Sequence, residues 1–367
     1  MKRIVLTGGG TAGHVTPCIA LIPDLKKAGY DIHYIGSYNG IERKLIEAEN
    51  IPYHGISSGK FRRYFDLKNF TDPFRVYKGI REARKVLKEL KPDVIFSKGG
   101  FVTVPVVLAS KKHKIPVIIH ESDITPGLAN KISIPIAKKV CANFPETMSH
   151  LPEEKAVLTG TPIRKELFTG NKIKGLDLCG FTANKIKGLD LCGFTANKPV
   201  IMVIGGSSGS RVINRVVRNM LPTLLRDYQV IHLCGTNNLD QELTKTKGYV
   251  QYEYVSEELK DLFATADLII SRAGANAISE FLALRIPNIL IPLSHGASRG
   301  DQILNAESFE SQGYSYLLLE EDLTVASLLQ AIEEVMGNRH TYIKAMKESK
   351  LNDSIKIIID LINKTAL

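Results

Sequence analysis

The stretch SRAGANAISE, Ser271–Glu280, indicates how this chain folds. The run before it, Asp267–Ile270, has the apolar character of a buried strand, and a helical pattern follows from Ala275 to Leu284. Gly274 lies at the turn between the two, where a residue without a Cβ lets the backbone come close to a ligand. The stretch therefore predicts a strand, a turn and a helix in that order.

The same turn is a candidate phosphate site. The first amide groups of a helix have no partner within it, and the helix dipole is positive there. Glu280 lies six residues beyond Gly274, where its carboxylate would accept hydrogen bonds from the paired hydroxyl groups of a sugar. This combination suggests a nucleotide-sugar pocket. The alternative is an ordinary strand–turn–helix with a surface glutamate, because glycine is common at such turns.

Size and composition limit the class of protein. The 367 residues suffice for two domains, and 44% hydrophobic residues are typical of a globular protein. No apolar run approaches the roughly 20 residues of a membrane span, and the N-terminus has no signal-length apolar core, so we expect a cytoplasmic location. No CxxC pattern or metal-ligand spacing occurs among the five cysteines, which we expect to be reduced: Cys18, Cys141, Cys179, Cys192 and Cys234.

The net charge of +10 predicts an anionic partner. A phosphorylated substrate and an anionic membrane surface both fit. Nucleic acid is not expected, because the sequence has no recognition-helix motif, zinc pattern or RNA-binding aromatic signature.

Strands and helices alternate from the N-terminus. Lys2–Thr7 is a predicted strand, Gly8–Gly13 a glycine-rich turn, and a helix and the strand Asp31–Ile35 follow. This alternation predicts a doubly wound parallel sheet. A nicotinamide nucleotide is weakly supported, because His14 directly follows the last glycine and no acidic residue closes the second strand.

Two further polar turns follow predicted strands of the first half. Lys98–Phe101 forms a second glycine turn, and His120–Asp123 follows the strand Pro116–Ile119. Polar residues just beyond the carboxyl ends of such strands line the ligand crevice.

The pattern restarts after Lys198, with a strand at Val200–Ile204, a third glycine turn at Gly205–Ser210 and a helix. We therefore expect a first domain over residues 1–163, a linker over 164–197 and a second domain over 198–341. The tail, about 342–367, is expected to be one helix that packs back on the first domain.

The expected linker contains an exact repeat. The 13 residues NKIKGLDLCGFTA, Asn171–Ala183, recur unchanged as Asn184–Ala196. Two copies cannot form a solenoid, so we interpret them as one normal copy and a recent duplication or sequence artefact. A longer surface loop would accommodate the extra copy, because loop-closure entropy grows slowly with length.

Basic and aromatic residues are mixed in Lys60–Phe65 (KFRRYF), and aromatic residues continue at Phe70, Phe74 and Tyr77. Such a mixture is typical of a surface that contacts anionic headgroups and the acyl boundary of a membrane. The alternative is a loop and an amphipathic helix whose rings pack inward.

Six motifs occur in order along the chain: GGGTAGHVTP (Gly8–Pro17), HESDITPGLANK (His120–Lys131), GTPIR (Gly160–Arg164), GGSSGS (Gly205–Ser210), SRAGANAISE (Ser271–Glu280) and DQILNA (Asp301–Ala306). Together they resemble the MurG family of N-acetylglucosaminyltransferases, which complete the lipid-linked precursor of the cell wall. The resemblance covers nearly the whole chain except the extra 13 residues. It implies an α/β protein of the GT-B fold, with two Rossmann-like domains whose parallel sheets face a cleft, and neither metal nor cofactor.

The resemblance implies a donor site for UDP-N-acetylglucosamine, mostly on the second domain. Glu280 would hold the ribose, Arg164 the nucleotide, the backbone near Val255 the uracil, and Gln302 the sugar with the support of Asn305. The other implied donor residues border the diphosphate, the reacting carbons or the sugar: Thr11, Ala12, Gly13, Asp123, Ser207, Arg272, Ala273, Gly274, Ala275 and Asn276.

The first domain would bind the acceptor, lipid I, and the membrane. The implied acceptor residues are Gly9, Gly10, Gly99, Gly100, Phe101 and Asn130. Two residues depart from other members: Asp123 stands where some have Asn, and Phe101 stands where others have Tyr. An ionised carboxylate accepts hydrogen bonds but does not donate them, so the contact of Asp123 with the donor sugar would differ.

The implied reaction is attack by the muramyl 4-hydroxyl of lipid I on the anomeric carbon of the donor, with inversion and loss of UDP. We expect His14 to be the base, because an ordinary imidazole is largely neutral at pH 7. A donor that only orients the ligand is the alternative role for His14, and His120 with Glu121 is the second candidate base. We expect peripheral binding to the anionic inner leaflet, on the cytoplasmic face, and contact with other cell-wall synthesis proteins.

Three other functions fit parts of the pattern. A related enzyme could add the sugar to diacylglycerol, and turnover of each acceptor would distinguish the two. A non-catalytic scaffold that binds nucleotide sugars is disfavoured by the presence of both glycine-rich halves and His14. A nicotinamide oxidoreductase is disfavoured by the three glycine turns.

Overall fold

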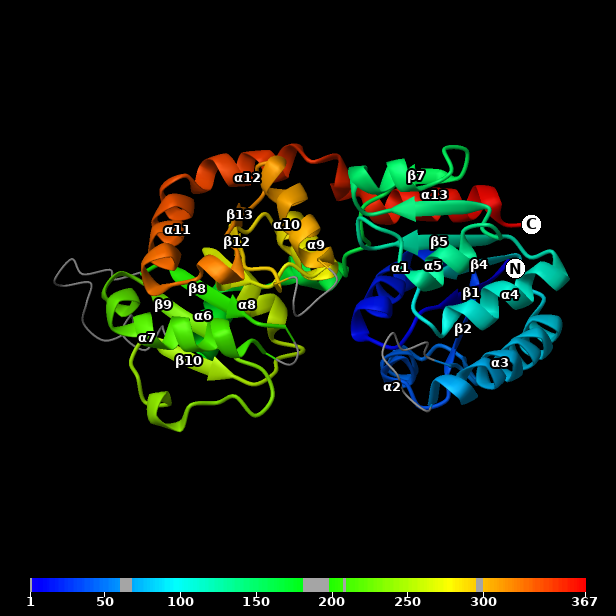
Figure 1. Cartoon of the computed structure of the whole chain (residues 1–367), viewed down its shortest axis with the longest axis horizontal. Coiled ribbons are helices and arrows are strands. Elements are labelled where there is room, and N and C mark those ends of the chain that lie inside the picture. Colours follow the sequence, from blue (N-terminus) through cyan, green and yellow to red (C-terminus); the bar gives the residue numbers. More distant parts are fainter. Residues whose placement is uncertain (1, 60–67, 181–197, 207–208, 295–299) are drawn as a thin grey trace. The chain divides into compact units, whose positions relative to one another are not determined.

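The computed structural model describes residues 2–59, 68–180, 198–206, 209–294 and 300–367 (Figure 1). The chain forms two compact units. Unit 1 comprises residues 1–164 and 350–367, and unit 2 comprises residues 165–349. No helix among the described residues is long and apolar enough to cross a lipid bilayer.

Unit 1 contains a seven-stranded parallel sheet in the order β3-β2-β1-β4-β5-β6-β7. Its strands are β1 (Arg3–Thr7), β2 (Asp31–Ser37), β3 (Tyr53–Ile56), β4 (Val94–Ser97), β5 (Val117–Glu121), β6 (Lys139–Ala142) and β7 (Ala156–Leu158). The order of strands reverses between β1 and β4, which are paired. The crevice at the carboxyl ends of these two strands is where ligands bind in sheets of this type.

Helices bury both faces of this sheet, so its central strands are largely apolar, as in β1 (RIVLT) and β4 (VIFS). One face, with Leu6, Phe96 and Ile118, is covered by α1 (Thr16–Lys27) and α13 (Ser354–Thr365). The opposite face, with Ile95 and Ile119, is covered by α3 (Lys68–Leu90) and α4 (Thr103–His113). The remaining helical segments of unit 1 are α2 (Ile41–Ala48), α5 (Leu128–Ser133), η1 (Ala12–His14), η2 (Pro145–His150) and η6 (Lys350–Asp353).

The helical tail is divided, whereas the sequence led us to expect one helix. α12 (Arg339–Glu348) belongs to unit 2, and α13 belongs to unit 1. Ile358 and Ile362 of α13 are completely buried against unit 1, and Tyr30 donates a hydrogen bond to Asn363 across 2.9 Å. The division occurs at residues 349–353, where the chain passes from one unit to the other.

Unit 2 repeats the architecture with a six-stranded parallel sheet in the order β10-β9-β8-β11-β12-β13. Its strands are β8 (Val200–Ile204), β9 (Gln229–Leu233), β10 (Tyr249–Tyr252), β11 (Leu268–Ser271), β12 (Asn288–Leu290) and β13 (Tyr316–Leu317). The switch point lies between β8 and β11, which are paired. Its helical segments besides α12 are α6 (Lys172–Leu178), α7 (Arg211–Asp227), α8 (Leu259–Thr265), α9 (Ala275–Leu284), α10 (Asp301–Ser311), α11 (Val325–Gly337), η3 (Lys165–Thr169), η4 (Gln241–Leu243) and η5 (Glu320–Asp322).

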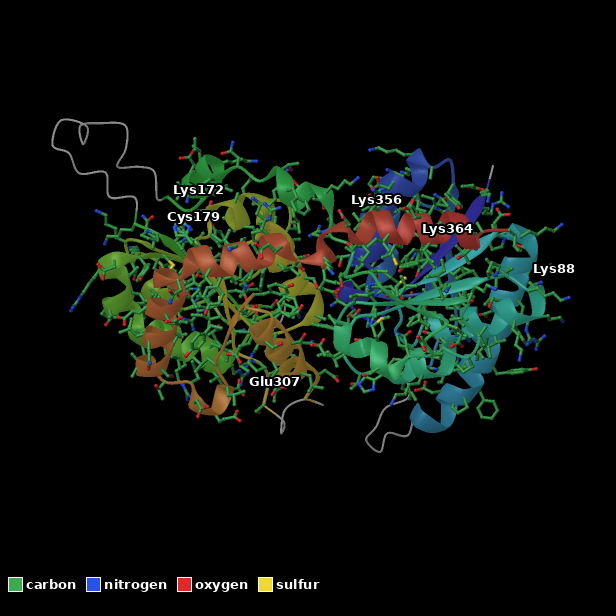
Figure 2. The ribbon with its side chains drawn as sticks, turned by 90° about the horizontal axis from the view of Figure 1, so that it is seen from above. Lys88, Lys172, Cys179, Glu307, Lys356 and Lys364 are labelled. Carbon is green, nitrogen blue, oxygen red and sulfur yellow. The ribbon has the colours of Figure 1, made fainter. Side chains whose placement is uncertain are left out.

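The first copy of the 13-residue repeat forms α6, and Figure 2 labels Lys172 and Cys179 at its two ends. The Asn171 side chain caps α6, and the Asn171 amide donates to Asp261 of α8 across 2.8 Å. Gly175 packs so closely on α8 that a Cβ there would stand 2.2 Å from the Asp261 carbonyl oxygen. The second copy lies outside the described residues.

Candidate functional site

In unit 1, the glycine turn after β1 brings η1 back over the end of its own strand. A Cβ on Gly8 would stand 2.2 Å from the carbonyl oxygen of His14, so only glycine fits there. Gly10 has a φ of 87°, a conformation that side chains other than glycine rarely adopt. Tyr34 fixes the turn by donating to the Gly8 carbonyl across 2.7 Å.

The glycine turn after β4 lies directly against the first one. Gly99 and Gly100 both have positive φ, of 90° and 88°. A Cβ on Gly100 would stand 2.3 Å from the Gly9 carbonyl oxygen and 3.5 Å from Nδ1 of His14. The two turns and the His14 imidazole therefore meet at the switch point of the sheet.

His14 is half-buried at this junction, with Nδ1 3.0 Å from the hydroxyl of Thr11. Burial lowers the pKa of its imidazole to about 4, the positive charge of Lys98 acts in the same direction, and the Glu42 carboxylate opposes both. The ring is therefore neutral at pH 7, and its pKa makes it a weaker base than an ordinary histidine.

Glu42 was missed by the sequence analysis. Its side chain is completely buried behind the first glycine turn and accepts hydrogen bonds from the amides of Gly10 and Ser37, across 3.3 and 3.0 Å. An acidic residue in the first turn of α2 was the only signal, and ordinary stabilisation of the helix dipole also accounts for it. The structure shows that Glu42 holds the turn beside His14.

His120 lies inside unit 1 and is completely buried. Its Nε2 is 2.8 Å from the carbonyl oxygen of Gly160, which can only accept, so Nε2 carries the proton. Burial, with a contribution from Lys98, holds the pKa of this imidazole well below its usual range. This contact ties the carboxyl end of β5 to Gly160, and the buried ring is not accessible to a substrate.

Glu121 organises the loop that follows β5. One carboxylate oxygen accepts from the amides of Ser122 and Asp123, across 2.8 and 3.0 Å. The other accepts from the Gly127 amide and the Asn130 side chain, across 3.0 and 2.8 Å. Four donors saturate this carboxylate, so it holds the loop in place and has no lone pair directed at a reacting hydroxyl.

In unit 2, the turn after β11 has the open geometry of an anion site. Gly274 is the N-cap of α9 with a φ of −70°, and no described side chain caps the helix. A Cβ on Gly274 would meet nothing within 4 Å. The fold itself therefore does not require glycine here, and its absence of a side chain leaves the helix N-terminus accessible.

Arg272 points away from this turn. Its guanidinium donates to the carbonyl oxygens of Ile291 and Pro292, each across 3.0 Å, to the Ser210 hydroxyl across 2.8 Å, and to the Glu320 carboxylate. These contacts join the ends of three segments of unit 2. The sequence grouped Arg272 with the donor residues, and the structure shows it engaged within the scaffold.

Residues of α10 brace the turn from the other side. Asn305 is buried and donates to the Ala273 carbonyl across 3.2 Å. The Gln302 side chain accepts from the Leu293 amide across 3.1 Å. Glu280 is half-buried on α9, six residues beyond Gly274. Of these residues, Asn305 contacts the turn itself and Gln302 holds the chain that follows β12, whereas Ser207 lies outside the described residues.

The remaining predicted residues differ in exposure. Ala273, Ala275 and Val255 of unit 2 are buried. In unit 1, exposed or half-buried positions are occupied by Thr11, Ala12, Gly13, Phe101, Asp123 and Arg164. No three His, Cys, Asp or Glu side chains come together as a metal site within the described parts of the chain.

Comparison with known proteins identifies the family. The glycosyltransferase family 28 N-terminal domain matches residues 4–142, and the C-terminal domain of that family matches residues 200–361. A protein of Lachnoclostridium phytofermentans is 67% identical over 367 residues, which is 100% of both chains, and is named a UDP-N-acetylglucosamine–N-acetylmuramyl-(pentapeptide) pyrophosphoryl-undecaprenol N-acetylglucosamine transferase. A Clostridium botulinum (strain Loch Maree / Type A3) protein of the same name is 58% identical over 364 residues, 99% of each chain.

A solved structure agrees with these relatives. MurG of Acinetobacter baumannii superposes with a TM-score of 0.74 at 25% identity, covering 99% of this chain and 100% of that one. This chain belongs to the MurG family. The GT-B fold expected from the sequence is thereby confirmed.

The motifs that carried the resemblance to MurG lie at corresponding places in the two sheets. Those of unit 1 follow the carboxyl ends of β1, β5 and β7, and two of those in unit 2 follow β8 and β11. The sixth forms the start of α10. Family motifs therefore mark the strand ends where ligand crevices occur, which is why six short segments sufficed to predict the fold.

Proposed function

We propose that this chain transfers N-acetylglucosamine from UDP-N-acetylglucosamine to the 4-hydroxyl of the muramyl residue of lipid I, with inversion at the anomeric carbon. As a MurG enzyme, it is a UDP-N-acetylglucosamine-dependent transferase of peptidoglycan synthesis. The 67% identity to the L. phytofermentans relative over the full chain carries this assignment. The position of attack and the inversion are the finer parts of the proposal.

Unit 2 is the proposed donor site. The N-terminus of α9, whose N-cap residue is a glycine without a capping side chain, and the open space over Gly274 support binding of the UDP diphosphate there. Glu280 lies on the same helix and would accept hydrogen bonds from the ribose. Asn305 and Arg272 keep the turn in place from behind, and they act as its support.

Unit 1 is the proposed acceptor site, with His14 as the base. When Nδ1–H of His14 donates to Thr11, the lone pair of Nε2 is left to take the proton of the attacking hydroxyl. The oxygen then bonds to the anomeric carbon as the bond to UDP breaks, and the negative charge leaves with UDP. Helix N-termini would stabilise that charge.

We also propose that α3 contacts the anionic inner leaflet, so that the enzyme is peripheral on the cytoplasmic face. Phe74 and Tyr77 are 76% and 62% exposed, so the alternative in which these two rings pack inward is wrong. Exposed cations continue the same helix at Arg75, Lys78, Arg81, Arg84, Lys85 and Lys88. Lys60–Phe65 lies outside the described residues, and the side chain of Phe70 is not described.

Release of UDP from UDP-N-acetylglucosamine, with and without a lipid I analogue, tests the function. The chain lacking Asn184–Ala196 is assayed in parallel. Release that depends on lipid I in either chain supports the transferase. Release with a diacylglycerol acceptor instead would support the glycolipid enzyme, and bound nucleotide without release to any acceptor would support the scaffold.

A further inference from the structure

A cavity of about 400 Å³ lies in unit 2, at the opposite end of the sheet from the proposed donor site. Ala266, just before β11, and Pro287, just before β12, line this cavity, which therefore lies at the amino ends of these two strands. Gly274, by contrast, follows the carboxyl end of β11. The cavity is thus separate from the turn at which we place the UDP diphosphate.

The walls of the cavity are mainly apolar. They come from η3, from the last turns of α8 and α9, and from α12, and they include Leu167, Phe263 and Ile343. Phe168 also lines the cavity and is 55% exposed, although burial of its ring away from water would be favourable. Cavities of about 300–1,000 Å³ with apolar walls and a few polar groups are typical sites for small molecules.

The charged residues that line the cavity are both cations, Arg285 and Arg339. Arg339 donates to Asp267 across 3.3 Å, and the ammonium group of Lys172 lies 3.5 Å from the same carboxylate oxygen. Arg285 is exposed, and no carboxylate within the described parts of the chain pairs with it. Of these four charged groups, three are cations and one is a carboxylate.

Helix ends oppose this positive charge only in part. α8 and α9 both end at the cavity, and each helix C-terminus carries roughly half a negative charge. Together these two ends offset about one of the positive charges. An excess of positive charge remains, so the cavity is better suited to an anion than to a neutral or cationic molecule.

We propose that this cavity binds a small anionic amphiphile, a molecule with an aliphatic chain and one carboxylate. The chain would lie against Phe168 and the apolar walls. The carboxylate would accept paired hydrogen bonds from the planar guanidinium of Arg285. This inference goes beyond the proposed function and does not depend on it, because we assign neither substrate to this end of the sheet.

Calorimetry with decanoate, at concentrations where it is monomeric, tests the site. We expect one decanoate to bind per chain and decanol to bind about tenfold more weakly, because a neutral hydroxyl makes no charge-assisted hydrogen bond. Saturating UDP should leave the affinity for decanoate unchanged. Absence of saturable binding, equal affinities for the two probes, or displacement of decanoate by UDP would each overturn the proposal.

Arg285→Gln tests the predicted contact with the carboxylate. It should weaken the binding of decanoate about tenfold and leave the binding of decanol nearly unchanged, because only decanoate has a charge to pair with the guanidinium. The matched control is Arg226→Gln, at an exposed position of α7, which should bind decanoate like the unmodified protein. Equal weakening by both variants would mean that net charge is responsible, and the proposal would fail.

Ala283→Phe tests the cavity itself, because it fills the space and keeps both arginines. Ala283 is half-buried near the end of α9 and lines the cavity. We expect this variant to bind neither probe, while thermal unfolding and UDP binding show that it is folded. Unchanged decanoate binding by the folded variant would place the probe elsewhere and overturn the proposal. If the variant does not fold, Arg285→Gln and its control decide the question.

Discussion

At the scale of single residues, His14 is the group whose role is most directly testable. Its pKa of about 4 makes it a weak base, so we expect His14→Ala to lower kcat by about 10²-fold, at the lower end of the usual contribution of a general base. UDP binding should change little, because the proposed contacts with its ribose and diphosphate, at Glu280 and the N-terminus of α9, lie on unit 2. Steady-state kinetics and calorimetry with UDP measure the two effects.

Two further variants define the role of His14. His150→Ala, at an exposed position of unit 1, should retain full activity. His14→Gln keeps a hydrogen-bond donor but cannot accept a proton. Near-normal turnover of His14→Gln would establish the alternative role, in which His14 only orients the ligand.

Variants of Arg272 and Glu280 should have different effects, the first on the stability of unit 2 and the second on binding of the donor. Arg272→Met removes a buried guanidinium that bonds two carbonyls, Ser210 and Glu320, so we expect it to destabilise unit 2 by about 3 kcal/mol. Glu280→Gln should leave stability nearly unchanged and weaken binding of UDP-N-acetylglucosamine about tenfold, because a charge-assisted hydrogen bond becomes a neutral one. Thermal unfolding and calorimetry measure the two quantities, and equal effects of both variants on both quantities would contradict the assignment.

At the scale of elements, α3 has an exposed face that fits an anionic membrane. Phe74, Tyr77, Arg81, Lys85 and Lys88 recur at intervals of three or four residues and therefore share that face. We expect Arg81→Glu with Lys85→Glu to weaken binding to phosphatidylglycerol vesicles by at least about tenfold, because each cation near such a surface contributes about 1 kcal/mol. Vesicle co-sedimentation at two salt concentrations measures this.

The control for α3 lies on α1, which covers the opposite face of the same sheet. Lys26→Glu with Lys27→Glu makes the same change of charge at exposed positions. If both pairs weaken vesicle binding equally, net charge is responsible and the face of α3 has no special role.

The residue that precedes α6 explains why the first copy of the repeat, and not the second, fits against α8. Gly170 precedes it, and a Cβ there would stand 2.0 Å from the Lys260 carbonyl oxygen. The residue before the second copy is Ala183, whose methyl group would meet that oxygen if the second copy took the same place. We therefore expect deletion of Asn184–Ala196 to keep the contacts of α6 and to shift Tm by no more than about 2 °C, since loop length has a small effect on stability. A large fall in Tm on deletion would mean that the second copy contributes contacts of its own.

At the scale of the whole molecule, the sequence predicted those features that depend on residues close together in the chain. Strand, glycine turn and helix follow each other along the chain, so the separate turns at Gly8–Gly13, Lys98–Phe101 and Gly274 followed from pattern and resemblance, whereas the packing of Gly100 on Gly9 did not. The directions of side chains could not be predicted in this way. Arg272, for example, donates hydrogen bonds to carbonyl oxygens about 20 residues later in the chain. Glu42 was missed for the same reason, since its partners Gly10 and Ser37 come from other elements of the fold.

Buried histidines should make the whole fold sensitive to acid. His232 is completely buried between Asn214 and Tyr249, each 2.9 Å away, and burial lowers the pKa of its imidazole to about 3. In the unfolded chain this histidine takes up a proton near pH 6.5, whereas in the folded chain it stays neutral until the pH is much lower. The stability of the fold is therefore full above pH 6.5 and is lost as pH falls toward the folded pKa. Each such histidine lowers the free energy of unfolding by up to about 1.4 kcal/mol for every unit by which pH falls in this range.

His232→Asn removes this titration and keeps a polar side chain between the same partners. It will lower stability at pH 7, but we expect its stability to fall less steeply than that of the unmodified protein between pH 6 and 4.5. Urea unfolding followed by circular dichroism measures the slope, because the chain has no tryptophan to report by fluorescence. The exposed His150→Asn is the control and should leave the slope unchanged. Parallel stability curves for His232→Asn and the unmodified protein would mean that the neutral core histidine does not cause the acid sensitivity.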